Sequence, residues 1–210
     1  IKTPLTSIIN YVDLIKKEGI SEEKVREYVE VLDRQSARLK KLIEDLLEAS
    51  KASTGNVEMH MEACDAAVMI SQVVGEYQDK LQAQDIEIVV NEAKNPANIM
   101  ADGRHLWRVF DNIMSNICKY TQDHTRVYVN VEDAGDQVRM IFKNISKYPL
   151  NISSDELMER FVRGDASRNT EGHGLGLSIA SSLTALMDGQ LTIDIDGDLF
   201  KITVAMKKQA

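Results

Sequence analysis

The chain has 210 residues, of which 43% are hydrophobic and 28% charged, a balance typical of one large or two small globular domains. Its net charge of −8 argues against sequence-independent nucleic-acid binding, which needs a basic surface to neutralise phosphates. No apolar run approaches the roughly 20 residues of a membrane-spanning helix. The two cysteines form neither a disulfide framework nor a metal-ligand spacing. We therefore expect no nucleic-acid partner, no membrane span and a reducing compartment.

The first domain is expected over residues 1–55, where two amphipathic helical patterns follow one another. The first helix is expected over about 3–18, because Pro4 suits a first helical turn and Gly19 suits a helix end. Ser21 is expected to cap a longer helix with heptad spacing. The heptad positions are Val25, Tyr28, Leu32, Gln35, Leu39, Leu42 and Leu46.

This apolar stripe is too long for the shorter first helix to cover. A second copy of the helical hairpin would cover it by completing a four-helix bundle, so we expect a homodimer. Packing of the hairpin on the C-terminal domain of the same chain is the alternative.

The second domain is expected over residues 56–210, where helical and strand patterns alternate. Asp196-Gly197 predicts a tight turn between two strands, and such hairpins indicate mixed or antiparallel pairing. The fold class is therefore α+β, with the helical hairpin followed by a two-layer α/β sandwich. Helices are expected over 65–83 and 103–120, and strands over 57–61, 86–90, 98–101, 127–131, 138–142, 191–195 and 199–204.

Three alternating glycines, Gly172, Gly174 and Gly176, lead directly into an apolar helical pattern. Glycine lets the backbone approach a ligand closely, and the start of a helix favours an anion. A flexible loop that closes onto a helix would show the same pattern. The segment before the glycines is polar and is not the buried strand that precedes them in a dinucleotide fold, and the Gly-Lys-Ser/Thr of a Walker loop is also absent. The polar segment 163–171 before them suggests a lid.

A second polar group lies in the helix predicted over 103–120. Its spacing places Asn112, Asn116 and Lys119 on one helical face. An amide oxygen is a suitable Mg²⁺ ligand, and lysine supplies a charge for a phosphoryl oxygen. A plain solvated face is the alternative. Together with the glycine segment, these residues predict a site for a nucleotide and Mg²⁺.

Four segments resemble the motifs of bacterial two-component sensor histidine kinases, in the order that the family shows. Val109–Tyr120 resembles the N box, Glu159–Asp165 the F box and Gly172–Gly176 the G2 box, while Ile1–Ile8 resembles the end of the H box. The resemblance implies a dimerisation and phosphotransfer hairpin followed by a Bergerat-type ATP-binding domain. It also implies a cytoplasmic core, within a parent protein in the cell membrane, that passes phosphate from ATP to a histidine and then to a response-regulator receiver domain.

The resemblance implies roles for four residues of the N box. Asn116 would coordinate Mg²⁺, while Asn112 and Lys119 would contact the phosphates of ATP. Tyr120 would lie beside the sugar or the base.

The resemblance also implies roles outside the N box. Arg163 would reach toward the γ-phosphate from the lid, and Lys119 would assist it in catalysis. Thr3 would orient a water molecule when the response regulator is dephosphorylated. The phosphate-binding glycine segment would comprise Gly172, Gly174, Leu175 and Gly176.

The sequence departs from the family pattern at two places. By this alignment the phosphoacceptor histidine falls two positions before Ile1, and none of the four histidines belongs to the first helix. We therefore expect this chain to bind ATP without phosphorylating itself. The G1 region, Phe142–Leu150, has neither the usual aspartate nor the usual glycines. Asn144 is the candidate replacement that accepts the adenine amino group, with several-fold weaker binding expected.

Two alternatives to a kinase core remain open from the sequence. One is a degenerate kinase that acts as a nucleotide-responsive scaffold or as a response-regulator phosphatase. The other is a different ATPase of the same superfamily, such as a chaperone or a mismatch-repair protein. The heptad hairpin and the Thr3-Pro4 context argue against the second.

Overall fold

The computed structural model describes residues 2–17, 19–55, 57–91, 97–150 and 175–209. The chain divides into two compact units, Ile1–Ser50 and Lys51–Ala210. Among the helices described, none has both the length and the apolar character that crossing a membrane requires.

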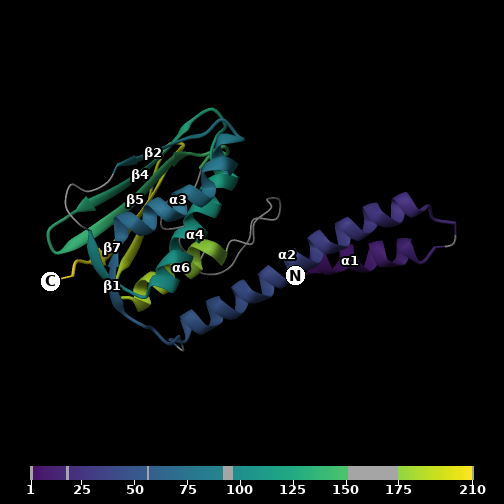
Figure 1. The fold of residues 1–210 in the computed structure, drawn as a ribbon, viewed down its shortest axis with the longest axis horizontal. Helices are drawn as coiled ribbons and strands as arrows, with labels where there is room; N and C mark the ends of the chain where they lie inside the picture. The colour runs from purple at the N-terminus through teal and green to yellow at the C-terminus, as the bar shows by residue number, and fades with distance from the viewer. Residues whose placement is uncertain (1, 18, 56, 92–96, 151–174, 210) are drawn as a thin grey trace. The chain divides into compact units, whose positions relative to one another are not determined.

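The first unit is built from the helices α1, Lys2–Ile15, and α2, Glu22–Ser53. Gly19 adopts a φ of +79° in the connection between them, and the backbone N–H of Lys24 donates to Ser21 Oγ at 3.4 Å. The rings of Tyr11 and Tyr28 meet edge to face, with centroids 5.3 Å apart. Figure 1 shows α1 running antiparallel beside the first half of α2. The predicted helical hairpin is therefore confirmed.

The second unit contains a mixed five-stranded sheet in the order β2-β4-β5-β7-β6. Strands β2 and β4 are parallel, and the other neighbours are antiparallel, while β1 and β3 form a separate antiparallel pair. The elements are β1 (Glu62–Asp65), α3 (Ala66–Gln82), β2 (Glu87–Asn91), β3 (Asn98–Ala101), α4 (Gly103–Tyr120), β4 (Arg126–Asp133), β5 (Gln137–Ile145), α6 (Leu175–Leu186), β6 (Gln190–Asp196) and β7 (Leu199–Lys207).

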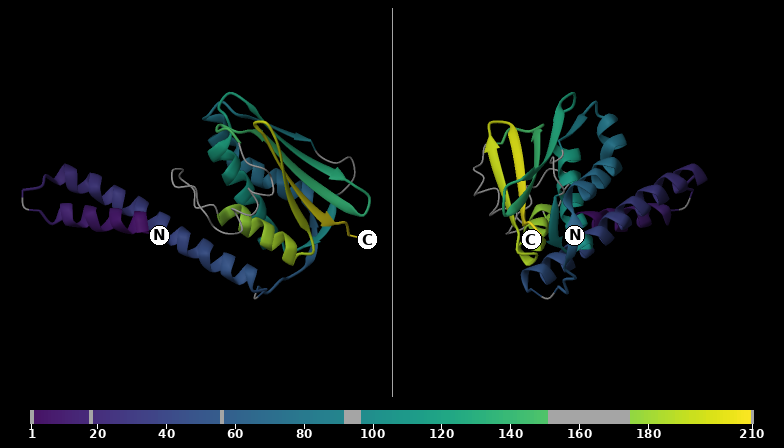
Figure 2. Two further views of the ribbon diagram at one scale, coloured as in Figure 1. Left: turned by 180° about the vertical axis from the view of Figure 1, so that it is seen from behind. Right: turned by 60° about the vertical axis from the view of Figure 1, so that its left-hand side comes forward.

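The helices α3, α4 and α6 all cover the same face of this sheet, as the views in Figures 1 and 2 show. Alternate side chains of each strand point into that layer, because successive residues of a strand face opposite sides. On β4, Val127, Val129 and Val131 are buried, and on β5 the ring of Phe142 lies 6.0 Å from that of Phe110 on α4. The predicted α+β class with a two-layer α/β sandwich is confirmed.

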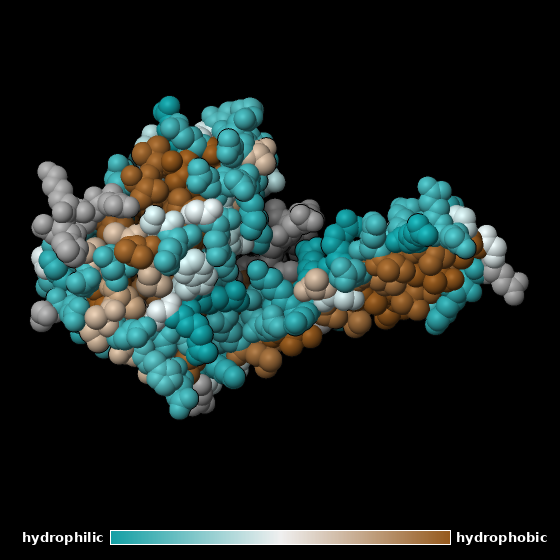
Figure 3. Space-filling view, viewed as in Figure 1, coloured by the Kyte–Doolittle hydropathy of each residue, from teal (hydrophilic) through white to brown (hydrophobic). Residues whose placement is uncertain are grey.

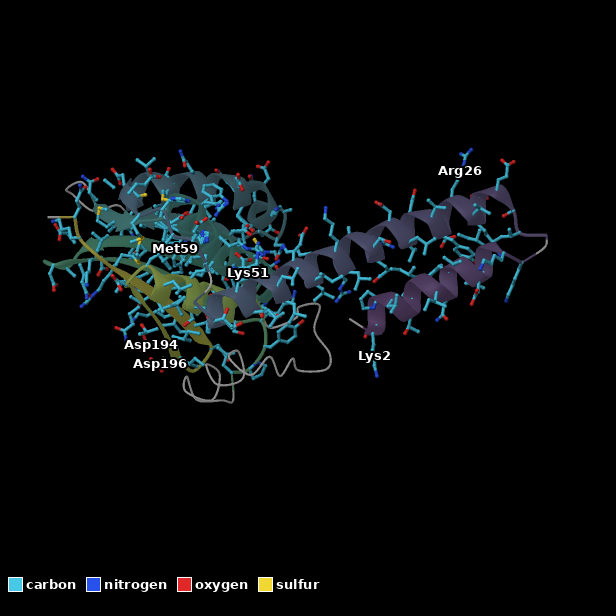
Figure 4. All side chains as sticks on the ribbon, turned by 90° about the horizontal axis from the view of Figure 1, so that it is seen from below. Lys2, Arg26, Lys51, Met59, Asp194 and Asp196 are labelled. Carbon is cyan, nitrogen blue, oxygen red and sulfur yellow. The ribbon has the colours of Figure 1, made fainter. Side chains whose placement is uncertain are left out.

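The turn at the end of β6 also agrees with the sequence. Gly197 adopts a φ of +58°, which the Asp196-Gly197 pair predicts, and β7 begins at Leu199. Figure 4 labels Asp194 and Asp196 near this turn, and Asp194 pairs with Lys201 across the hairpin at 3.0 Å.

The strand predicted over 57–61 is wrong, because the strand in this region is β1, Glu62–Asp65. Its position is set by pairing with β3, in which Glu62 stands opposite Ala101. The preceding segment makes a different backbone contact, since the N–H of His60 donates to the carboxylate of Asp102 at 2.9 Å.

Candidate functional site

Helix α4 is held at both ends, and this fixes the polar face that the sequence predicts. At its start, Asp102 Oδ1 accepts the backbone N–H of His105 at 3.1 Å and caps the helix. At its end, the Tyr120 carbonyl accepts the N–H of Lys147 at 2.7 Å, and the Ile145 carbonyl accepts that of Gln122 at 2.9 Å. The end of α4 is therefore joined to the end of β5. The apolar face of α4 is buried through Leu106, Val109, Phe110, Ile113, Met114 and Ile117.

Gly176 brings the start of α6 directly against the polar face of α4. A Cβ atom added at Gly176 would lie 3.2 Å from Asn112 Oδ1, closer than an ordinary van der Waals contact. The Nδ2 atom of Asn112 is buried and has no hydrogen-bond partner among the described residues. A buried polar atom without a partner is rare in native proteins, and such an atom is available to a bound water, ion or ligand. The structure thus joins two motifs that lie far apart in the sequence.

The junction between α4 and β5 contains a second such atom. Thr121, which follows α4, is 1% exposed, and its Oγ1 has no hydrogen-bond partner among the described residues. The sequence interpretation missed Thr121, although it directly follows the N-box match and is a polar residue at a helix end.

Asn144 lies on the neighbouring strand β5 and is 3% exposed. Its side chain faces the helical layer, because Met140 and Phe142 alternate with it on the buried side of the strand. Its Nδ2 donates to the Ile145 carbonyl at 3.4 Å. An amide oxygen in this position is able to accept a hydrogen bond from a ligand.

A hydrogen bond between helices holds α4 against α3 at the residue before Asn112. The Tyr77 hydroxyl donates to Asp111 Oδ1 at 2.5 Å, and Arg108 Nη1 lies 3.5 Å from Asp111 Oδ2. Burial raises the pKa of Tyr77, and the hydrogen bond to Asp111 raises it further, so the hydroxyl remains a donor at neutral pH. The sequence interpretation missed this contact, because it joins residues that no local spacing relates.

The remaining predicted site residues are distributed as follows. Asn116 and Tyr120 are half-buried on α4 and Lys119 is exposed, while Leu175 is half-buried at the start of α6. Thr3 is exposed on α1, next to the buried Pro4. Arg163, Gly172 and Gly174 lie outside the described residues.

A metal ion at this site would depend on ligands other than a carboxylate or histidine cluster. Within the described ranges, no group of three or more His, Cys, Asp and Glu side chains is arranged to hold a metal ion. The amide oxygens on α4 fit a cation that shares its coordination with phosphate oxygens, as Mg²⁺ does.

The helical hairpin carries an apolar surface that the first unit leaves uncovered. Figure 3 shows apolar side chains gathered along the hairpin. The members of this apolar hairpin surface are 44–57% exposed, and they are Leu5, Ile9, Val29, Ile43, Leu46 and Leu47.

Two family models match the chain. The model of the histidine kinase-, DNA gyrase B- and HSP90-like ATPases matches residues 101–209. The model of the His Kinase A (phospho-acceptor) domain matches residues 1–55.

The curated relatives are sensor proteins. The chain is 29% identical over 194 residues to the sensor protein VanS of Enterococcus faecium, covering 91% of this chain and 50% of the relative. It is 27% identical over 213 residues to the sensor protein VanSC of Enterococcus gallinarum, covering 100% of this chain and 58% of the relative. The chain therefore spans only about half the length of these relatives.

Solved structures of histidine kinases share the fold. The Acinetobacter baumannii kinase AdeS matches with a TM-score of 0.76 at 14% identity, covering 100% of this chain and 97% of that one. The kinase ThkA, solved with its response regulator TrrA, matches at 0.77 with 19% identity, covering 99% and 58%. Full-length ShkA, solved with AMPPNP, matches at 0.74 with 21% identity, covering 99% and 44%.

The ATPase model covers more than half of the chain, and the phospho-acceptor model covers the hairpin before it. This tandem order is the one that the N-box, G2-box and H-box resemblances imply. The chain thus belongs to the histidine kinase-, DNA gyrase B- and HSP90-like ATPase family, and its two domains are those of a two-component sensor kinase catalytic core.

Proposed function

We propose that this chain binds ATP with Mg²⁺ and is the part of a longer sensor kinase that passes the γ-phosphoryl group to a histidine. From that histidine the group would pass to an aspartate of a response-regulator receiver domain. The observation that carries the proposal is the buried, unpartnered Nδ2 of Asn112, a side chain whose Oδ1 faces the start of α6 at Gly176. An ATPase-family domain that follows a phospho-acceptor domain supplies the context.

Each of four described residues has a different proposed contact with ATP or Mg²⁺. Asn112 Nδ2 would donate to a phosphate oxygen, and Asn116 Oδ1 would be the ligand for Mg²⁺. Lys119 supplies a positive charge beside the phosphates, while Asn144 Oδ1 accepts the adenine amino group at the far end. When bound, Mg²⁺ neutralises charge that develops on the phosphates during transfer. The contribution of the protein is therefore mainly positioning and hydrogen bonding.

Several predicted roles stay predictions. They concern Arg163, Gly172 and Gly174 beyond the described residues, Thr3 on α1, and Tyr120 and Leu175 beside the nucleotide.

ShkA was solved with AMPPNP and ThkA with a response regulator, and both support the assignment of ligand and partner. Since ATP and receiver domains occur together in the cytoplasm, we place this core there, within a membrane-anchored parent.

Calorimetric titration with AMPPNP and Mg²⁺ tests the nucleotide site. Asn112→Ala is expected to weaken binding about 10- to 100-fold, because a hydrogen bond to a charged group is worth about 1.5–3 kcal/mol. Asn91→Ala is the matched control, since Asn91 donates to Asn130 in an exposed pair on neighbouring strands. Unchanged affinity in Asn112→Ala, with a melting temperature near that of the original chain, would contradict the proposal.

Phosphorylation is tested by adding His-Glu before Ile1, which completes the family's H-box pattern ahead of Lys2-Thr3-Pro4. Radiolabelled ATP is expected to place acid-labile phosphate on the added histidine. The unextended chain is expected to remain unlabelled. Stable labelling of the unextended chain, or none of the extended chain under conditions where AMPPNP binds, would oppose the assignment.

We also propose that two copies pair through the apolar hairpin surface, forming the four-helix bundle predicted from the sequence. Sedimentation equilibrium tests this, with Leu46→Lys and Leu47→Lys expected to shift the chain toward monomer. Val68→Lys is the control, because Val68 is 51% exposed on α3 in the other unit. A monomeric original chain, or a dimer that tolerates both hairpin substitutions, would argue against this pairing.

A further inference from the structure

The carboxylate of Asp102 joins two elements that the sequence keeps separate. Asp102 is 4% exposed, and each of its oxygens has a different partner. Oδ1 accepts the backbone N–H of His105 at 3.1 Å, in the first turn of α4. Oδ2 accepts the backbone N–H of His60 at 2.9 Å, in the segment between α2 and β1. Segment 57–61, which contains Met59 as labelled in Figure 4, is called the linker below.

The electrostatics favour this arrangement. Burial acts to raise the pKa of Asp102, but the hydrogen bonds from His60 and His105 and the nearby imidazole of His105 outweigh it and hold the pKa below its usual value. The His105 Nδ1 atom lies 3.5 Å from Asp102 Oδ1. A buried carboxylate is stable only when its oxygens are hydrogen-bonded, so loss of the linker contact would leave Oδ2 poorly satisfied.

Residues that follow the linker contact in the sequence also lie against the start of α4. A Cβ added at Gly103 would lie 3.4 Å from Glu62 Oε1 and 3.8 Å from Cys64 Sγ, both on β1. Strand β1 pairs with β3, which ends at Ala101 directly before Asp102. A movement of the linker is therefore transmitted to the first turn of α4.

The helix that begins at Asp102 is the one that carries Asn112 and Asn116. The apolar face of α4 is packed, and its far end is joined to β5. A displacement of its capped start would therefore shift Asn112, whose amide faces Gly176.

We propose that Asp102 is a positioning residue that couples the linker to the nucleotide-binding helix. The hydrogen bond from His60 holds the carboxylate in the orientation that caps α4, so the state of the linker changes nucleotide affinity. By reciprocity, bound nucleotide changes the stability of the linker contact by the same factor. The effect on nucleotide affinity rests on the function proposed above, whereas the coupling between the linker and α4 is independent of that function.

The first test needs no nucleotide. His60→Pro removes the N–H that donates to Asp102, while His60→Ala keeps it and alters only an exposed side chain. Amide hydrogen exchange is measured at Leu106, whose N–H donates to the Asp102 carbonyl at 2.8 Å in the first turn of α4. We expect exchange at Leu106 to be about fivefold or more faster in His60→Pro and unchanged in His60→Ala. Equal exchange in the two variants would overturn the proposal.

The second test uses AMPPNP with Mg²⁺ on the full chain. Saturating nucleotide is expected to slow exchange of the His60 amide about fivefold or more. In Asp102→Ser, the hydroxyl still caps α4 but is too short to serve both partners, so this nucleotide effect should disappear.

Asp65→Asn is the matched control, since Asp65 caps α3 by accepting from Ala67 and Val68 of its own helix, at 2.9 and 3.3 Å. A nucleotide effect on the His60 amide that survives Asp102→Ser would overturn the proposal. Failure of AMPPNP to bind the unaltered chain would instead refute the proposed function, and the first test would still decide the coupling.

Discussion

Gly176→Ala separates the binding of nucleotide from the stability of the fold. The added methyl group would lie 3.2 Å from Asn112 Oδ1 and 3.6 Å from its Cγ, whereas ordinary contacts begin near 3.4 Å. The Asn112 amide must then turn or move by a few tenths of an ångström. Its Nδ2 is the buried, unpartnered donor that we assign to a phosphate oxygen.

The expected effect on stability is small because two terms oppose each other. Replacing glycine by alanine stabilises a helix interior by roughly 0.5–1 kcal/mol, and this is an upper value for Gly176, the second residue of α6. Displacing a side-chain amide by a few tenths of an ångström costs a similar amount, so we expect the free energy of unfolding to change by less than about 1 kcal/mol. The effect on binding is larger. Misplacing a donor to a charged oxygen removes about 1.5–3 kcal/mol, which weakens nucleotide binding about 10- to 100-fold.

Thermal unfolding and calorimetric titration with AMPPNP and Mg²⁺ measure the two effects separately. Gly75→Ala is the matched control, because Gly75 lies inside α3 and an added Cβ there meets nothing within 4 Å. That variant should bind AMPPNP like the original chain. If Gly176→Ala also binds like the original chain, the geometry assigned to Asn112 is refuted. If Gly176→Ala lowers the free energy of unfolding by well above 1 kcal/mol, the substitution acts mainly by straining the fold and not by changing the binding site.

Three further predictions concern stability, affinity and pH. Tyr77→Phe should lower the free energy of unfolding by about 1.5–3 kcal/mol, measured by urea unfolding, because Asp111 Oδ1 loses the hydrogen bond from the Tyr77 hydroxyl; a loss no larger than that in the exposed Tyr148→Phe would contradict this. Asn144→Ala should weaken AMPPNP binding several-fold, whereas Asn144→Asp should strengthen it by about 1 kcal/mol. If calorimetric titration shows unchanged affinity in both variants, Asn144 does not contact adenine. The pKa of Asp102 is lowered in the fold, so its stabilising contribution is complete above the ordinary value of 3.8 and is lost as the pH falls through the folded pKa. The difference in unfolding free energy between the original chain and Asp102→Asn should therefore shrink below about pH 4, and a difference independent of pH would disprove this.

Local patterns predicted most elements of the fold. The sequence predicts a helix over 103–120 and α4 occupies Gly103–Tyr120, because the apolar period that marks a helix is a local property of the sequence. The β6–β7 hairpin was predicted from alternating apolar residues around Asp196-Gly197 for the same reason. The strand expected over 57–61 failed, since β1 is selected by pairing with β3 and not by its own composition.

The sequence by itself determined the helical hairpin, the α+β class and the residues of the N box, because helix periodicity, capping and short motifs are local properties. It could not place Gly176 against Asn112, identify Thr121 as buried and unpartnered, or show that Tyr77 holds Asp111. It also could not show that the second oxygen of Asp102 holds the linker. Those features depend on contacts between residues remote in sequence, and only the packing of helices on the sheet decides which polar atoms meet and which are left for a ligand.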